Sequence, residues 1–429
     1  MDKIHNKYLL PSYILTILFS PLYIIIFFHH LSVPVAGGSP HVYNPKETIF
    51  LYCGSSGSSP ASTRTWIGDV ESEHFPLNQS ENNASTTADP SQQPRTVEKI
   101  PYMKARLSRY QFSYTFNLTP GQKFIRFYFY ETSYLNLDRS KAFFSVTAGS
   151  FTLLSNFSTQ LAAIDSQQDT IFKEFCVNVQ ENQNLNITFT PSQDYKDSYA
   201  FINGIEIISM PLNLYYTNAT GETEYPLVGR TAGKLFSLSN SNALETFSTQ
   251  FAPVAVYQTA RTMGNDTKVN ENYQLTWEFP VDSAFTYLVR LHFCEFQPEI
   301  TVTGNRVFEI DIANQTAETR ADVIAWGGDR SGVPVYKDYA VTMGSKENQK
   351  KQNLSIALHP APAYMTKYSD AILNGVEIFK VDNSGSLAGP NPDPRTTTLT
   401  SGNNHSNNRK IIIAVVVGVV SSFVAVSVV

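Results

Sequence analysis

Apolar and polar side chains alternate along much of this chain, which is the pattern of β-strands. In 125–130, one side of the strand carries Ile125, Phe127 and Phe129, while arginine and tyrosine occupy the other side. Residues 289–294 repeat the pattern, with Arg290, His292 and Cys294 on the second side. A period of two indicates a sheet with one face on a core. Such segments follow one another from 49 to about 379 with no long amphipathic helix, so we predict an all-β fold.

These two segments belong to a longer internal repeat. Residues 110–146 and 200–207 are matched by 273–310 and 371–378, at an offset of about 163 to 171 residues. An offset of this size is typical of tandem domains. We therefore predict two tandem antiparallel β-sandwiches, in residues 40–212 and 213–382. Each copy ends on an Asn-Gly pair between apolar runs, and such pairs favour turns because both residues tolerate positive φ.

The second copy departs from the first before its first matched residue, Tyr273. The first copy has an apolar run at Leu51–Cys53 and a tryptophan at Trp66, whereas the stretch before Tyr273 contains no counterpart of either. We therefore expect the second sandwich to lack its opening strand and to be the less stable of the two. Residues 234–238 are the one segment that could fill the gap.

The N-terminus has the order of a secretory signal peptide. Basic residues precede an apolar run from Tyr8 to Phe28, and small residues follow near Gly37, so residues 1–37 are expected to be removed on export. Sequons for N-glycosylation are spread along the whole chain, as on an extracellular surface. They lie at Asn78, Asn83, Asn117, Asn156, Asn186, Asn218, Asn265, Asn314, Asn353 and Asn404.

The C-terminus predicts attachment to the plasma membrane. Residues 383–410 are polar and rich in proline, serine and asparagine, as in a stalk. Residues 411–429 form an uncharged apolar run of about 28 Å as a helix, enough to span a bilayer once. A small-residue site, a polar spacer and an apolar tail also fit a glycolipid-anchor signal, which is the alternative to the spanning helix that we predict.

The charge and the cysteine content argue against further classes of function. Charged residues make up only 16% of the chain, and the net charge of -5 without a basic stripe argues against nucleic-acid binding. The three cysteines, Cys53, Cys176 and Cys294, cannot all pair within the chain. Cys53 and Cys176 share the first copy and are either a disulfide or buried thiols. No cysteine or histidine spacing fits a metal site.

Several motifs resemble the malectin-like ectodomain of plant receptor kinases typified by FERONIA and THESEUS. They lie at 51–56 (LYCGSS), 65–69 (TWIGD), 138–149 (DRSKAFFSVTAG), 198–204 (SYAFING) and 259–264 (TARTMG). The resemblance covers about 43–381 and continues into the apolar tail. It implies two malectin-like sandwiches that bind secreted peptides or cell-wall polysaccharide. It further implies small glycolipid-anchored co-receptors and related receptor kinases as partners, and no cofactor.

Members of this family continue past the membrane into a protein kinase. This sequence contains no Gly-rich loop on a strand, no His-Arg-Asp and no Asp-Phe-Gly, so we expect no phosphoryl transfer from it. The leading hypothesis is a binding protein held at the membrane. The alternative is a truncated gene model of a complete receptor kinase.

The candidate ligand-binding residues are Tyr128, Tyr130, Glu131 and Tyr134, because sugar rings stack on exposed aromatics beside fixed polar groups. Packing of the tyrosines beneath a second layer is the competing interpretation. The second copy has His292, Cys294, Glu295 and Phe296 instead, so the aromatic set is not duplicated. A glycosidase using Asp138, Glu309 or Asp311 is a third class of function. Glu309 and Asp311 alternate with apolar residues as on a solvated strand face, which argues against it.

Overall fold

The computed structural model describes residues 43–70, 72–75, 85–181, 183–211, 214, 236–238, 252–264, 266–345, 349–381 and 384–393. The expected signal peptide, the apolar segment 411–429 and most of the stalk lie outside these residues. So do the sequons at Asn78, Asn83, Asn218, Asn265 and Asn404. Among the residues described, no helix is long and apolar enough to cross a membrane.

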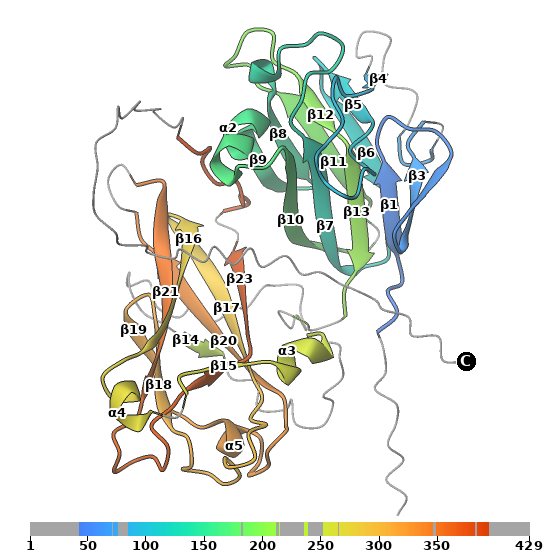
Figure 1. The fold of residues 1–429 in the computed structure, drawn as a ribbon. Coiled ribbons are helices and arrows are strands. Elements are labelled where there is room, and N and C mark those ends of the chain that lie inside the picture. The colour runs from blue at the N-terminus through green and yellow to red at the C-terminus, as the bar shows by residue number, and fades with distance from the viewer. Residues whose placement is uncertain are drawn as a thin grey trace, which may run out of the picture. The chain divides into compact units, whose positions relative to one another are not determined.

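The first repeat folds as a β-sandwich, as predicted (Figure 1). One sheet has the order β10 (Thr170–Val179), β7 (Gly121–Tyr130), β13 (Gly204–Ser209), β1 (Thr48–Tyr52), β3 (Arg64–Gly68), β2 (Ser58–Ala61). The facing sheet has the order β6 (Phe112–Phe116), β11 (Leu185–Pro191), β8 (Phe143–Ala148), β9 (Phe151–Ser158). A third, small sheet contains β12 (Ala200–Ile202), β5 (Ala105–Ser108) and β4 (Thr86–Ala88). Two short helices, η1 (Arg139–Lys141) and α2 (Thr159–Ser166), complete the unit.

The strands described in the first sandwich pair antiparallel with one exception. β1 and β3 pair in parallel, which corrects the purely antiparallel expectation. The connection between them carries β2, which pairs antiparallel with β3.

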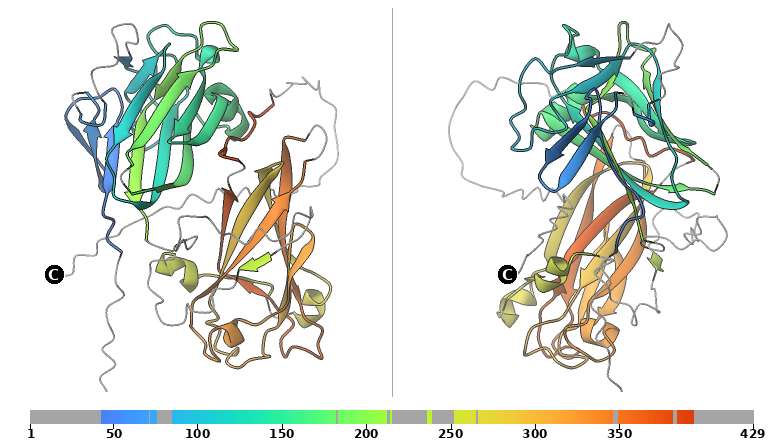
Figure 2. Two further views of the ribbon diagram at one scale, coloured as in Figure 1. Left: turned by 180° about the vertical axis from the view of Figure 1, so that it is seen from behind. Right: turned by 90° about the vertical axis from the view of Figure 1, so that its right-hand side faces the viewer.

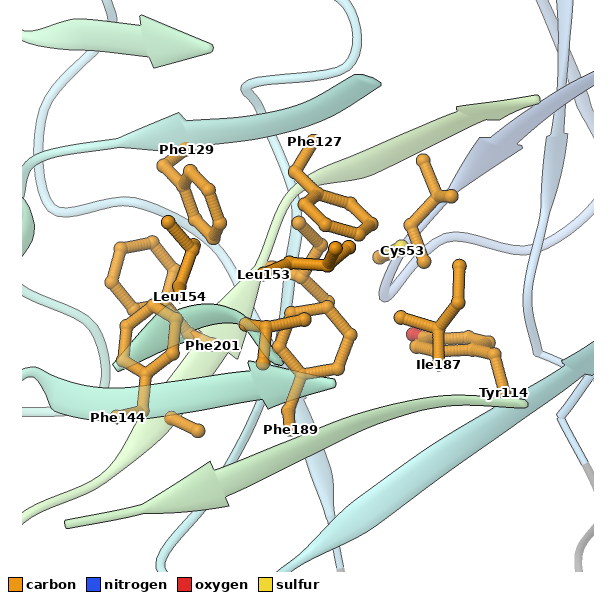
Figure 3. Close-up of a cluster of buried hydrophobic side chains, with 14 of the residues drawn as sticks. Cys53, Tyr114, Phe127, Phe129, Phe144, Leu153, Leu154, Ile187, Phe189 and Phe201 are labelled. Atoms are coloured by element: carbon orange, nitrogen blue, oxygen red, sulfur yellow. The ribbon is translucent and has the colours of Figure 1, made fainter. Parts of the chain in front are cut away.

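Aromatic side chains fill the core of the first sandwich (Figure 3). Ile125, Phe127 and Phe129 of β7 are fully buried, as their alternation predicts. Phe127 and Phe129 meet Phe189 of β11 and Phe144 of β8 at ring separations of 5.8 and 5.7 Å. Aromatic pairs at such distances add to the stabilisation from burial alone.

The second repeat forms a sandwich with fewer described strands (Figure 2). One sheet has the order β14 (Phe236–Leu238), β20 (Val335–Met343), β17 (Phe285–Phe293), β23 (Gly375–Val381). The other has the order β16 (Leu275–Asp282), β21 (Lys351–Pro360), β18 (Phe308–Ile312), β19 (Gln315–Ala321). β15 (Arg261–Thr262) pairs with β22 (Ile372–Leu373), and the helices are α3 (Val254–Gln258), α4 (Thr267–Asn270) and α5 (Val323–Trp326).

The edges of the two long sheets differ. β13 pairs with β1 in the first sandwich, whereas no strand in the described part of the chain pairs with the free edge of the equivalent β23. Residues 236–238 pair with β20, at the opposite edge of the sheet. They therefore do not replace the opening strand, which was the role considered for 234–238.

All three cysteines are free thiols, so the disulfide considered between Cys53 and Cys176 is absent. Cys53 follows β1 and Cys176 lies on β10, with β13 and β7 between these strands. Three inter-strand spacings of about 4.8 Å separate them by roughly 14 Å, whereas a disulfide needs Cα atoms within about 7 Å.

The second face of each long sheet is covered rather than solvated. In the first sandwich Tyr52, Trp66, Tyr102, Tyr128 and Tyr130 form a separate buried cluster on this face. In the second, Arg290, His292 and Cys294 are buried. The alternation identifies the strands correctly, but the side chains that point away from the core of each sandwich lie beneath another layer.

The Asn-Gly pairs do not form hairpin turns. Asn203 is a bend between β12 and β13, which belong to different sheets. Its side chain donates to the carbonyl of Lys104 at 2.7 Å and thereby holds the covering segment in place. Asn374 donates in the same way to the carbonyl of Thr259 at 2.8 Å. The repeated motif therefore fastens the preceding segment onto the sheet in each sandwich.

Candidate binding surface

Tyr128 is a buried member of an ion network. Its hydroxyl donates to Glu206 at 2.5 Å, and Arg126 donates to Tyr128 at 3.2 Å and to Glu174 at 2.7 Å. Trp66 meets the Tyr128 ring edge-on at 5.3 Å. Burial raises the pKa of Tyr128. Its ring therefore offers no open face to a ligand in this structure.

Tyr130 and Tyr134 are buried at the end of β7. The Tyr134 hydroxyl donates to the carbonyl of Tyr130 at 3.1 Å and accepts from Asn203 at 3.0 Å. The Tyr134 ring packs against Phe201 at 5.4 Å. The competing interpretation, that the tyrosines pack beneath a second layer, fits this geometry better than an exposed aromatic surface.

Glu131 differs from these tyrosines because its hydrogen bonding is incomplete. The residue is 7% exposed, and one carboxylate oxygen accepts from Thr159 at 2.5 Å. The other, Oε1, is buried with no hydrogen-bond partner. Burial raises the pKa of Glu131 to about 7, against opposing effects of Thr159 and Arg139.

The equivalent face of the second sandwich carries a different polar network. His292 is buried, with one ring nitrogen 2.8 Å from the hydroxyl of Tyr257 and the other 2.6 Å from Glu377. Arg290 donates to both oxygens of Asp338 at 2.6 Å. No nucleophile faces His292 in these contacts, so the arrangement is that of a packed polar layer.

Exposed apolar side chains gather at one end of the second sandwich, and we call this end of each sandwich the loop end. It consists of the connections that follow β7 and β11 in the first sandwich, and β17 and β21 in the second, with the segments before β6 and β16. The strand registers place these segments together, because β6 begins where β11 ends and β16 begins where β21 ends. In the part of the second sandwich that the structure describes, every exposed large apolar side chain lies here: Val269, Tyr273, Phe296, Val302 and Tyr364.

The loop end of the first sandwich matches this in part. Tyr110 and Tyr195 are exposed at the positions equivalent to Tyr273 and Tyr364. Clustered exposed apolar side chains are typical of surfaces that bind partners. Neither tyrosine pair was among the sequence-based candidates, although Tyr110 and Tyr273 open the repeat. Their repetition was the available signal, but repetition alone does not distinguish a core residue from an exposed one.

Two hollows lie at the opposite end of the sandwiches. One, of about 620 Å³, is lined by residues that include Asn314, Gln315 and Asn353. The other, of about 470 Å³, includes Asn117 and Glu181. Both are polar, and neither contains a residue from the sequence-based ligand set.

The acidic residues considered for glycoside hydrolysis are divided between the sandwiches, with Asp138 in the first and the half-buried Glu309 and Asp311 on β18 of the second. Asp138 is exposed and caps η1, whereas Asp311 is half-buried and lies 3.3 Å from His359 on the second sandwich. The described residues contain no cluster of three or more potential metal ligands.

Comparison with known proteins agrees with this architecture. The protein-family model of the malectin-like domain matches residues 51–234 and 231–381. The receptor-like protein kinase FERONIA of Arabidopsis thaliana is 41% identical over 82% of this chain, and the match covers 44% of FERONIA. ANXUR1 of the same plant is 33% identical over 81% of this chain and 45% of its own. The chain thus matches less than half the length of these curated relatives.

Solved structures give the same assignment. The crystal structure of the receptor-like kinase FER is 40% identical with a TM-score of 0.70, covering 81% of this chain and 100% of that one. A structure of the plant peptide RALF23 in complex with FER and LLG2 has a TM-score of 0.68 at 38% identity, covering 82% and 100%. The chain belongs to the malectin-like family and corresponds to the tandem malectin-like ectodomain of FERONIA-type receptor-like kinases.

Proposed function

We propose that this chain is the extracellular, peptide-binding part of a membrane-attached receptor and catalyses no reaction itself. The observation that carries the proposal is the structure of FER with the peptide RALF23 and LLG2, because that fold is shared over most of this chain. The partners proposed here are a secreted peptide of the same kind and a small glycolipid-anchored co-receptor. The apolar segment 411–429 would hold the protein at the plasma membrane, with the body outside the cell.

The loop end of the second sandwich is the surface that we propose for this contact. Tyr364 is 86% exposed and Tyr273 is 68% exposed, which is unusual for tyrosines without a partner. Aromatic side chains of this kind are enriched among the residues that dominate binding energy at interfaces.

Binding of RALF23 to residues 43–393, measured by calorimetry with and without LLG2, tests the proposal. We expect Tyr364→Ser to weaken binding at least tenfold, that is, by about 1.4 kcal/mol or more. Val97→Ser is the control, because Val97 is 97% exposed and belongs to the first sandwich, outside the surface proposed here. No binding by the unmodified protein would contradict the peptide proposal, whereas equal affinities for both variants would contradict only the choice of surface.

Cell-wall polysaccharide is a second proposed ligand, for the first sandwich. The support is the pair formed by Phe143 and Tyr195, whose rings stack 4.0 Å apart with Tyr195 44% exposed. A preformed aromatic stack at the loop end offers a flat surface to sugar rings. Loss of wall-oligosaccharide binding in Tyr195→Ser, with peptide binding unchanged, is the expected result. Retention of oligosaccharide binding would exclude this stack as the site.

A further inference from the structure

A buried arginine connects two acidic residues at the end of β17 in the second sandwich. Arg306 is 3% exposed, and one terminal nitrogen donates to Glu295. The other donates to Asp370 at 2.7 Å and to the side chain of Gln297. The guanidinium thus neutralises two carboxylates that would otherwise be unpaired inside the protein, which is the condition under which buried charges are tolerated.

The first sandwich keeps one member of this network and loses the others. In the aligned repeats, Glu131 corresponds to Glu295, Ala142 to Arg306 and Tyr199 to Asp370. Ala142 and Tyr199 are each 1% exposed, so these positions are as deeply buried as their counterparts. The arginine side chain is therefore missing where its acidic partner remains.

Two buried polar atoms at these positions of the first sandwich lack a hydrogen-bond partner. Oε1 of Glu131 and the hydroxyl of Tyr199 are both buried without a hydrogen-bond partner. Such atoms are rare in native proteins, because a buried polar group without a hydrogen-bond partner destabilises the fold. The backbone N–H of Tyr199 donates to the carbonyl of Lys141 at 3.2 Å, which places Tyr199 beside Ala142.

We propose that Glu131 and Tyr199 form a binding site for a guanidinium cation, held where the Arg306 guanidinium lies in the second sandwich. The carboxylate supplies the charge and one acceptor, and the tyrosine hydroxyl supplies a second acceptor. The connection that follows Glu131 is exposed at Leu135, Asn136 and Asp138, and a ligand would approach from that side. The cation is either a small free guanidinium or the side chain of an arginine in a bound polypeptide.

The electrostatics of the site agree with an absent cation. Burial raises the pKa of Glu131 to about 7, with Arg139 acting in the opposite direction. Glu131 in turn raises the pKa of Tyr199, after the larger effect of burial. A bound cation would reverse the effect on Glu131, as an opposite charge does beside any carboxyl group.

The guanidinium site lies in the first sandwich and the proposed peptide surface lies on the second, so the two can be tested independently. Methylguanidinium is the probe, titrated into the full-length chain in buffer of constant ionic strength and followed by NMR of the Glu131 region. We expect saturable binding that weakens at least tenfold in Glu131→Gln and less in Tyr199→Phe. Asp197→Asn is the control, since Asp197 is an exposed carboxylate at the same end and should leave the affinity unchanged.

Ala142→Arg is a second test, which is used if Glu131→Gln is poorly folded. Ala142→Arg would give the first sandwich the arginine that the second sandwich has at Arg306. We expect this variant to lose methylguanidinium binding and to melt at a higher temperature. Titration with blocked arginine and blocked lysine amides distinguishes a free guanidinium from a peptide side chain as the bound cation. If the arginine amide binds as tightly as methylguanidinium and the lysine amide binds more weakly, the cation is an arginine side chain of a polypeptide. Absence of methylguanidinium binding to the unmodified chain would overturn the proposal and leave the two atoms to an ordered water.

Discussion

At the scale of single residues, pH acts on the first sandwich through the carboxyl group of Glu131. Its pKa rises from an ordinary 4.5 to about 7 on folding. Below 4.5 the group is neutral in both the folded and unfolded chain. Between these values the unfolded chain releases a proton that the folded chain keeps, so the free energy of unfolding falls as pH rises.

We therefore expect the Glu131 contribution to fall by about 3 kcal/mol across this window, at about 1.4 kcal/mol per pKa unit. Glu131→Gln should remove this dependence, because an amide does not titrate. Urea unfolding of both proteins below 4.5 and above about 7 measures the difference. A constant difference between the two proteins at both pH values would show that the Glu131 pKa is not raised in the folded protein.

Gly204 provides a second test at this scale. A Cβ at Gly204 would lie 2.5 Å from the Pro101 side chain and 3.0 Å from Trp66, in the layer that covers the sheet. We expect Gly204→Ala to destabilise the protein by about 1–3 kcal/mol through overpacking. Gly344→Ala is the control, since nothing lies within 4 Å of a Cβ there. Equal melting temperatures for the two variants would mean that the covering layer yields easily.

At the scale of elements, the sequence predicted the strands and the repeat more successfully than the surfaces. Strong alternation at 125–130 and 289–294 identifies a strand whatever covers it. Alternation cannot distinguish a solvated face from one beneath a second layer, so it predicts Tyr128 and Tyr130 on an exposed face although both are buried. The covering segments depend on contacts distant in sequence, such as Asn203 with Lys104, for which local periodicity carries no signal.

The Asn-Gly pairs illustrate the same limit. Their composition favours a hairpin, and the chain does bend at Asn203. The glycines are required for another reason, which is close approach: a Cβ at Gly375 would lie 2.7 Å from Val256. Only the packed structure contains that information.

The edge of β23, which pairs with no strand among the residues that the structure describes, gives a prediction at the element scale. An unpaired edge leaves backbone groups without partners and favours aggregation. Expressed separately, residues 40–212 should melt cooperatively and at a higher temperature than residues 213–382. Equal, cooperative melting of the two fragments would mean that another segment completes the second sheet, and hydrogen exchange at β23 would then show protection.

At the scale of the whole molecule, the two ends of each sandwich differ in chemistry. Exposed tyrosines gather at the loop ends, whereas Asn117, Asn314 and Asn353 line the polar hollows at the opposite ends. Glycans attached to these sequons would cover the hollows and leave the loop ends accessible. This separation supports partner binding at the loop ends over ligand binding in the hollows.

Glycopeptide mass spectrometry of the chain expressed in plant cells tests this division. We expect high occupancy at Asn117, Asn186, Asn314 and Asn353, whose side chains are exposed. Asn156 should be occupied least, because it is half-buried and donates to Asp194 at 2.9 Å, and Ser158 of its sequon is buried as the cap of α2. Glycosidase treatment should lower the apparent mass by several kilodaltons without changing RALF23 affinity. An unchanged mass would contradict export by this route, and a changed affinity would place the peptide near the glycans rather than at the loop end.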